Sequence, residues 1–165
     1  MSGQATTTAA RNIDLQAGGG FTYIRGDYGS SLKGFALYGD LDLTNHLGGE
    51  FVFHQANAHD NSKVYERTYE LGPRYHLTYG RFKPYVKGMY GRGVFNYPHN
   101  VANLAFNLFA VGAGTDYALF ERVNLRVDYE FQHWFGFPPN GLTPQLVTIG
   151  VAYHFPGRLQ RGRHY

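Results

Sequence analysis

Charged side chains recur at every second position in several segments of the sequence. The clearest case is Arg126, Asp128 and Glu130, which alternate with large apolar residues. In an extended chain such residues share one face, where guanidinium groups and carboxylates can form ion pairs. An unpaired charge shielded from water would be costly, so we expect these groups to meet in one network. Its predicted members are Glu50, Glu70, Arg74, Arg92, Arg126, Asp128 and Glu130.

The predicted network suits two uses. The first is structural, with paired charges filling and closing an interior; the second is a gated path for small ions. Folding the chain about the turn near residue 81 places Glu70 opposite Arg92, if the even positions of segment 84–97 face inward. We favour the structural use, because a barrel of about eight strands leaves too little lumen for solute diffusion.

Catalysis and metal binding are poorly supported by residue types and spacing. Acyl-transfer chemistry would need a serine beside a histidine and an acid, but the alternation aligns no serine with His54, His133 or His154. The chain has no cysteine, which excludes thiol chemistry and disulfides. A loop metal site at His59, Asp60 and His99 is a weak alternative. We expect no metal, no cofactor and no enzymatic activity.

The segments that carry these charges have the period of β-strands. In LVTIGVAYHF, residues 146–155, every second side chain is large and apolar, and the residues between are small or polar. Tight turns near residues 45, 81 and 120 alternate with longer loops near 60, 100 and 139. The expected strands lie at 13–23, 34–43, 47–54, 65–77, 84–97, 109–117, 123–132 and 146–155. The sequence therefore predicts an all-β, eight-stranded antiparallel up-and-down barrel.

Composition indicates that the apolar face of this barrel meets lipid. Charged residues make up only 16% and aromatic residues 17%, yet mean hydropathy is −0.38, whereas soluble domains average about 25% charged residues. The opposite face mixes charges with glycine and alanine, which suits a narrow lumen rather than a solvated surface. No run of about 20 apolar residues could form a membrane helix. We therefore expect a transmembrane β-barrel with its apolar face outward.

The loops and ends of the chain carry the remaining candidates. The loop at 134–144 contains Trp134, Phe135 and Phe137, which could bind a partner or form part of an aromatic girdle. Arg25 and Lys33 near one rim could meet lipid phosphates. The barrel is expected over 12–155, after a polar segment at 1–11 and before a basic tail at 156–165. The basic residues before the tail are scattered, so we expect no nucleic-acid binding.

Three stretches resemble the small OmpA/OmpX-like outer-membrane β-barrel domain family. These are LVTIGVAYHF, which ends in an aromatic residue like a C-terminal β-signal, RFKPYVKGMYGRGVF (81–95) and AVGAGTDYALFERVNLRVDYEF (110–131). The resemblance implies a barrel in a Gram-negative outer membrane, with periplasmic termini and a lumen plugged by charged pairs. It also implies a structural role in that membrane, among its lipid and lipopolysaccharide, alone or as a subunit docked on other outer-membrane proteins. Surface binding through the loops and a narrow ion path are the alternatives.

Overall fold

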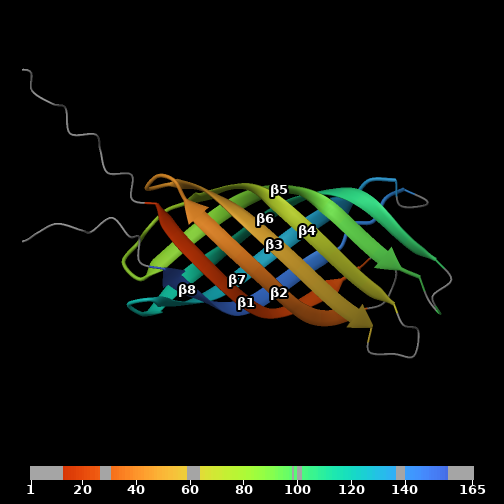
Figure 1. The fold of residues 1–165 in the computed structure, drawn as a ribbon, viewed down its shortest axis with the longest axis horizontal. Coiled ribbons are helices and arrows are strands. Elements are labelled where there is room, and N and C mark those ends of the chain that lie inside the picture. The colour runs from red at the N-terminus through yellow and green to blue at the C-terminus, as the bar shows by residue number, and fades with distance from the viewer. Residues whose placement is uncertain are drawn as a thin grey trace, which may run out of the picture.

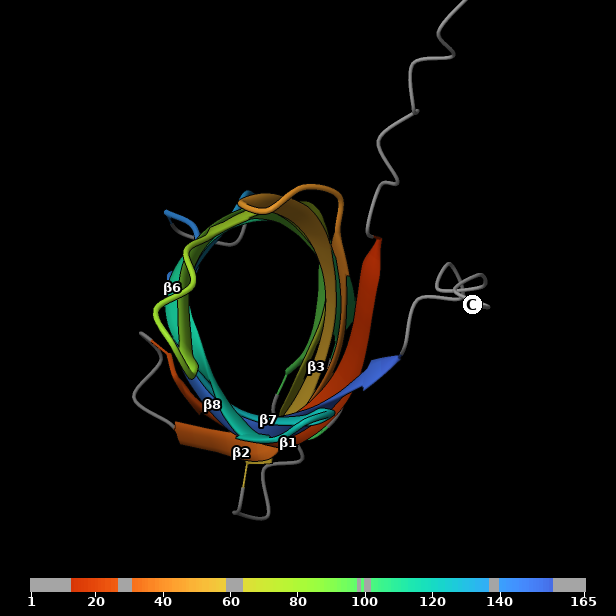
Figure 2. The same ribbon diagram turned by 90° about the vertical axis from the view of Figure 1, so that its left-hand side faces the viewer.

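Eight antiparallel strands form a closed barrel in sequence order (Figures 1 and 2). This computed structural model describes residues 13–26, 31–58, 64–97, 99, 102–136 and 140–155. The predicted eight-stranded antiparallel up-and-down architecture is confirmed, whereas the segments 1–11 and 156–165 lie outside the described residues. The strands are β1 (Asp14–Arg25), β2 (Ser31–Asp42), β3 (Leu47–Ala58), β4 (Tyr65–His76), β5 (Phe82–Asn96), β6 (Asn103–Phe120), β7 (Val123–Trp134) and β8 (Gln145–Phe155).

The barrel has a tight-turn end and a long-loop end. Residues 43–46, 77–81 and 121–122 connect strands at the tight-turn end, where β1 also begins and β8 ends. The other four connections lie at the long-loop end, on the right of Figure 1. Among the described residues, no helix is long and apolar enough to cross a membrane.

The two faces of the strands have the opposite polarity to those of a soluble barrel. Val127 is 44% exposed and Ile149 54% exposed on the outer surface, while Glu130 and Arg126 are at most 1% exposed inside. Because the outer surface is largely apolar over the middle of the strands and most charges lie within, the favourable solvent for this surface is hydrocarbon. The predicted outward orientation of the apolar face is confirmed.

β6 is longer than the alternation predicts. The sequence indicated a loop at 97–103 and a strand at 109–117, but β6 begins at Asn103, and its first residues continue the ladder with Gly93–Asn96 of β5. Alternation is weak in this part of β6 because apolar and polar residues share the outward face there. Backbone hydrogen bonding to β5 extends the strand where the side-chain pattern does not indicate it.

The middle of the seam between β1 and β8 is lined inside by small neutral residues. A methyl group on Gly20 would overlap the backbone of Gly150, which lies directly opposite, so glycine is needed for this close approach. Further along the same seam the hydroxyls of Thr22 and Thr148 hydrogen-bond at 2.8 Å. The seam is thus held by its ladder and one hydroxyl pair, apart from Asp14 and His154 at its rim.

Replacing Val127 with arginine tests the outward face. Val127 lies near the middle of β7, where a cation facing hydrocarbon costs about 2–4 kcal/mol of unfolding free energy. The matched control is Gln145→Arg, an exposed first residue of the neighbouring β8, where the expected cost is about 0–1 kcal/mol. Urea unfolding in lipid vesicles measures both, and equal costs would contradict the face assignment.

Candidate functional site

Two arginines form a charged layer across the lumen on the side of the tight-turn end. Arg74 of β4 contacts Asp40 at 2.7 Å and Asp116 at 2.6 Å. Arg126 of β7 reaches the same two carboxylates at 2.5 and 2.6 Å and Glu50 at 3.3 Å. All five side chains are at most 3% exposed. Such short charge-assisted contacts, shared between two cations and three anions, offset the cost of removing these charges from water.

Lys87 of β5 forms the next layer with three carboxylates. Its ammonium lies 2.8 Å from Glu50, 3.0 Å from Asp128 and 3.0 Å from Glu130. The hydroxyl of Tyr85 donates a hydrogen bond to Asp128. The ammonium of Lys87, which has three hydrogen-bond donors, therefore connects β5 to β3 and β7 across the lumen.

A hydrogen-bonded chain continues toward the long-loop end and ends at a tryptophan. The Nε2 of Gln132 donates to the Oε1 atoms of Glu70 and Glu130, at 2.7 Å each. The indole Nε1 of Trp134 donates to Gln132 Oε1 at 2.9 Å, which fixes the amide in this orientation. His54 Nδ1 lies 3.4 Å from Glu70. These bonds join the charged layers to the apolar region above them.

A cluster of buried apolar side chains, here called the apolar cap, lies at the long-loop end of the lumen. Trp134 is fully buried, and its ring lies where a side chain on Gly93 would otherwise project. The cap consists of Trp134 and the buried inward-facing residues around it. Its members are Ile24, Leu32, Ala56, Val64, Phe95, Leu108, Trp134, Leu142 and Leu146.

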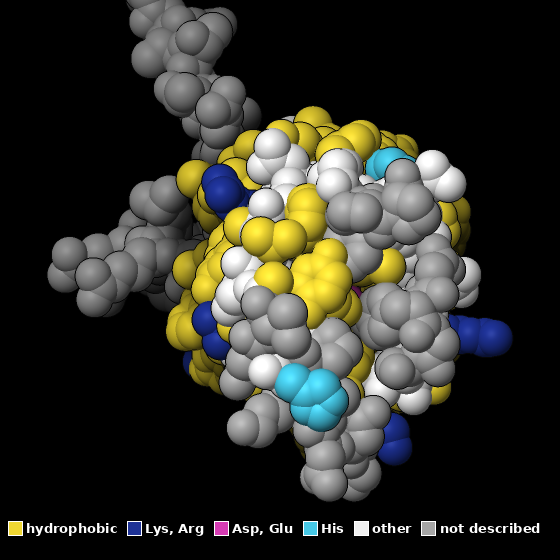
Figure 3. Space-filling model, turned by 90° about the vertical axis from the view of Figure 1, so that its right-hand side faces the viewer, with side chains coloured by type: hydrophobic (Ala, Val, Ile, Leu, Met, Phe, Trp, Pro, Cys, Tyr) yellow, Lys and Arg dark blue, Asp and Glu magenta, His cyan; other side chains and the backbone are white. Residues whose placement is uncertain are grey.

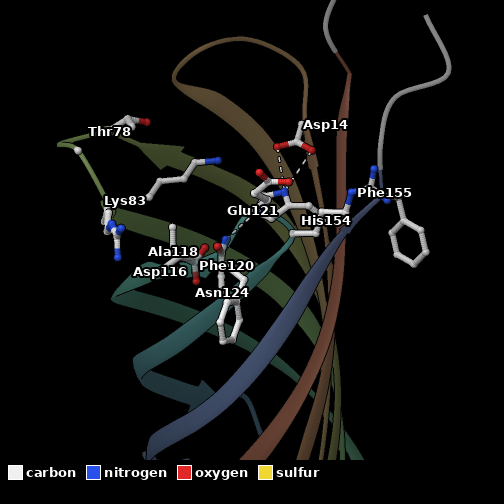
Figure 4. A pocket seen from close by; sticks show the side chains of 13 residues that line it. Asp14, Thr78, Lys83, Asp116, Ala118, Phe120, Glu121, Asn124, His154 and Phe155 are labelled. Atoms are coloured by element: carbon white, nitrogen blue, oxygen red, sulfur yellow. Dashed lines mark hydrogen bonds and ion pairs between the residues drawn. The ribbon is translucent and has the colours of Figure 1, made fainter. Parts of the chain in front are cut away.

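The space left inside the barrel differs between its ends. Beside Glu50, Lys87 and Arg126 the void is only about 10 Å³, close to the least that holds one water molecule. At the tight-turn end a wider cavity of about 470 Å³ opens, lined in part by Lys83, Asn124 and His154 (Figure 4). The cavity at the tight-turn end is therefore far larger than the void beside the charged side chains.

His54, Glu70 and Glu130 are grouped closely enough to be considered as metal ligands. One ligand atom of each lies within 4.8 Å of the others. However, the amide of Gln132 already bridges the two glutamates, and Lys87 contacts Glu130. A hydrogen-bond donor and a cation thus already contact these carboxylates, and the group is better explained as part of the network.

Six of the seven predicted network residues lie in the lumen, and Arg92 lies on the outer surface. Arg92 is exposed and pairs with the outward-facing Tyr69, whereas Gly91 is the residue opposite Glu70. The odd positions of β5 face inward, so the prediction that its even positions do so was wrong. Both faces of β5 mix polar and apolar residues, and the alternation therefore gave no clear choice.

The correct inward face of β5 supplies the lysine that the sequence reasoning missed. Lys87 follows Tyr85 on this face, and both contact the network. Asp116 shares its face of β6 with Gly112 and Gly114, so alternation could have added it to the predicted network. Gln132 was missed because an amide carries no charge to mark it.

The predicted partner-binding loop is divided by the structure. Trp134 is the last residue of β7 and is buried in the cap rather than exposed, so its placement at a loop tip was wrong. Its backbone N–H donates to Leu142 O at 2.8 Å, which draws this part of the chain inward. Phe135 is 49% exposed, and Phe137 lies outside the described residues.

Replacing Lys87 with methionine tests the charged layers. The substitution keeps the length of the side chain but leaves Glu50, Asp128 and Glu130 without their shared cation, so we expect a loss of about 3–5 kcal/mol in unfolding free energy. Lys33→Met, on the exposed outer face of β2, should change it by less than about 0.5 kcal/mol. Guanidinium unfolding in detergent micelles measures both, and similar losses would contradict the network.

Trp134 is the sole tryptophan, so its fluorescence reports on the cap. The substitution Gly93→Val would displace the indole ring. We therefore expect the emission of Trp134 to shift to the red and to be quenched more easily by acrylamide. Gly88→Val is the control, since Gly88 lies on the outward face of the same strand with open space around it. An unchanged spectrum in Gly93→Val would show that the ring is not packed against this glycine.

Comparison with known proteins agrees with the barrel and its polarity. The model of the outer membrane protein beta-barrel domain matches residues 1–155, and comparison with curated proteins gives no match. Similar solved structures include Neisserial surface protein A, with 15% identity over 87% of this chain and 97% of that one and a TM-score of 0.69. OprG from Pseudomonas aeruginosa has 16% identity over 89% and 98%, with a TM-score of 0.66.

A third similar structure is Ail of Yersinia pestis, solved in complex with the heparin analogue sucrose octasulfate. It has 14% identity over 87% of this chain and 99% of that one, with a TM-score of 0.57. At such identities the structural likenesses concern the fold, while the family follows from the match over most of the sequence. The chain therefore belongs to the outer membrane protein beta-barrel domain family, and its strands span a bacterial outer membrane.

Proposed function

We propose that the chain is a structural barrel that anchors in and stabilises the outer membrane while keeping its own lumen closed. Its tight-turn end and both termini face the periplasm, and the long-loop end faces outward. The observation that carries this proposal is the succession of the charged layers and the apolar cap along the lumen. The layers around Arg126 and Lys87 leave a void of only about 10 Å³, and the cap around Trp134 follows above them.

The charged layers and the cap oppose the passage of an ion for different physical reasons. An ion entering the charged layers would have to displace partners held at 2.5–3.5 Å, whereas an ion entering the cap would lose its hydration among mostly apolar side chains. Uncharged solutes meet the same filled space. Paired charges in one region and buried apolar side chains in the other support a structural role over the ion-path alternative.

Conductance across planar bilayers tests the closed lumen. We expect no discrete openings from the reconstituted wild-type barrel. Trp134→Ala should also stay closed, because the charged layers remain below the cap, and Phe131→Ala on the outward face of the same strand serves as its control. Long-lived openings of the wild type would overturn the proposal, and openings of Trp134→Ala alone would assign the seal to the cap.

Surface binding at the long-loop end is a second candidate, and Phe135 favours it. This ring is 49% exposed, while its backbone N–H donates to Asn107 O at 2.8 Å, so an apolar side chain is presented from a fixed backbone. Rigid aromatic side chains of this kind often anchor interfaces. The mass of particles extracted from native membranes in mild detergent tests association, which Phe135→Ser should weaken if this ring contacts a partner.

A further inference from the structure

Charge is segregated on the outer surface of the barrel. In the part of the chain that the structure describes, the outward-facing charged side chains near the long-loop end are all positive: Arg25, Lys33, Arg67 and Arg92. The described acidic residues are either buried in the lumen or, like Asp14 and Glu121, at the tight-turn end. In Figure 3, which views the long-loop end, dark-blue side chains project from the periphery.

Two of these arginines lie together on neighbouring strands. Arg67 of β4 pairs with Val94, and Arg92 of β5 pairs with Tyr69, so the two arginines occupy diagonal positions across one ladder. Such positions are roughly 7–8 Å apart. Two amides flank them: Gln55 is directly opposite Arg67, and Asn107 is directly opposite Arg92. We call these four outward-facing residues the polar row.

An aromatic row marks the depth of the polar row in the membrane. One step toward the tight-turn end on each of the four strands, the outward residue is Phe53, Tyr69, Tyr90 or Phe109. Tyr69, Tyr90 and Phe109 are 44–59% exposed. Aromatic belts lie at the boundary between hydrocarbon and headgroups. The polar row therefore lies on the headgroup side of that boundary, next to lipid rather than in open water.

The polar row presents donors that the described protein does not use. Arg67 is held by a bond from its Nε to Gln55 Oε1 at 3.2 Å and by the ring of Tyr65, 5.7 Å from its guanidinium carbon. This bond leaves the terminal nitrogens of its guanidinium to contact a ligand. The side chain of Arg92 makes no hydrogen bond or ion pair with the described residues. Two like charges this close favour an anion between them, and the guanidinium fork fits phosphate oxygens in pairs.

We infer that the polar row binds a phosphate of the lipid A headgroup in the outer leaflet, through Arg67 and Arg92. Gln55 and Asn107 supply neutral hydrogen bonds to the phosphate or the adjoining sugar, and the aromatic row contacts the acyl chains. A lipid is favoured over a soluble partner because the row points sideways from the barrel wall, beside the aromatic belt. The inference deepens the proposed membrane-stabilising function and rests on its orientation, with the long-loop end outward.

The test measures binding of bisphosphorylated lipid A to the full chain folded in neutral detergent micelles, by native mass spectrometry. Arg67→Gln/Arg92→Gln should bind roughly tenfold more weakly than the wild type. The matched control is Arg25→Gln/Lys33→Gln, which removes the same charge from the same end on β1 and β2 and should stay within about twofold. All four positions face outward, and slower migration after boiling on gels checks that each variant is folded.

Three results would overturn the inference. The first is an equal loss in both double variants, which would indicate diffuse attraction to a positive rim. The second is undiminished binding of dephosphorylated lipid A, which would assign recognition to the sugar or the acyl chains. The third is binding of inorganic phosphate as tight as that of lipid A, which would assign the row to a soluble anion. None depends on orientation in a bilayer or on conductance, so failure here is distinguishable from failure of the proposed function.

Discussion

Arg74, Lys87 and Arg126 hold the barrel together from within. Each contacts carboxylates on at least two other strands, so that β2 to β7 are connected across the lumen as well as around the wall. The distances between these cations and carboxylates must be maintained closely. The reason is that a buried charge without its partner destabilises the protein by more than the ion pair stabilises it. A narrow, regular barrel is consequently needed to keep these distances, and the distances in turn disfavour any widening of the barrel.

The lumen changes in character along the barrel axis. An open polar mouth lies at the tight-turn end, paired charges fill the middle, and an apolar cap lies under the long loops. The hydrogen-bonded chain from Glu70 and Glu130 through Gln132 to Trp134 joins the last two regions. Tryptophan suits this boundary because its ring packs with the cap while its N–H satisfies an amide below. Trp134 thus buries a large apolar ring and at the same time satisfies a buried polar group.

Most of the architecture could be predicted because each strand has one face toward lipid and one toward the polar lumen, which makes apolar and polar residues alternate along the sequence. β7 shows it most clearly, with valine, leucine and tyrosine outward and arginine, aspartate and glutamate inward. β5 does not show it. Because the even instead of the odd positions of β5 were predicted to face inward, the predicted network contained Arg92 and lacked Lys87. Polar residues on one face of β5 line the lumen, and polar residues on its other face lie at the level of the lipid headgroups. The alternation pattern does not tell these two kinds of polar position apart.

The position of Trp134 shows a second limit of sequence reasoning. An aromatic residue beside glycine and proline resembles a loop tip, yet the cavity beside Gly93 accommodates its ring. That complementarity joins residues some forty positions apart in the chain and has no local pattern. The sequence therefore indicates where the wall lies better than it indicates what fills the interior.

The small neutral lining of the seam between β1 and β8 bears on how the barrel is completed. These strands come from opposite ends of the barrel domain, so they pair only when the sheet curls round on itself. The edges that meet carry glycines and threonines inside, and no buried ion pair spans them. Pairing of β1 with β8 therefore removes few polar side chains from water. The charged side chains that must be desolvated as the barrel forms lie mainly on β2 to β7.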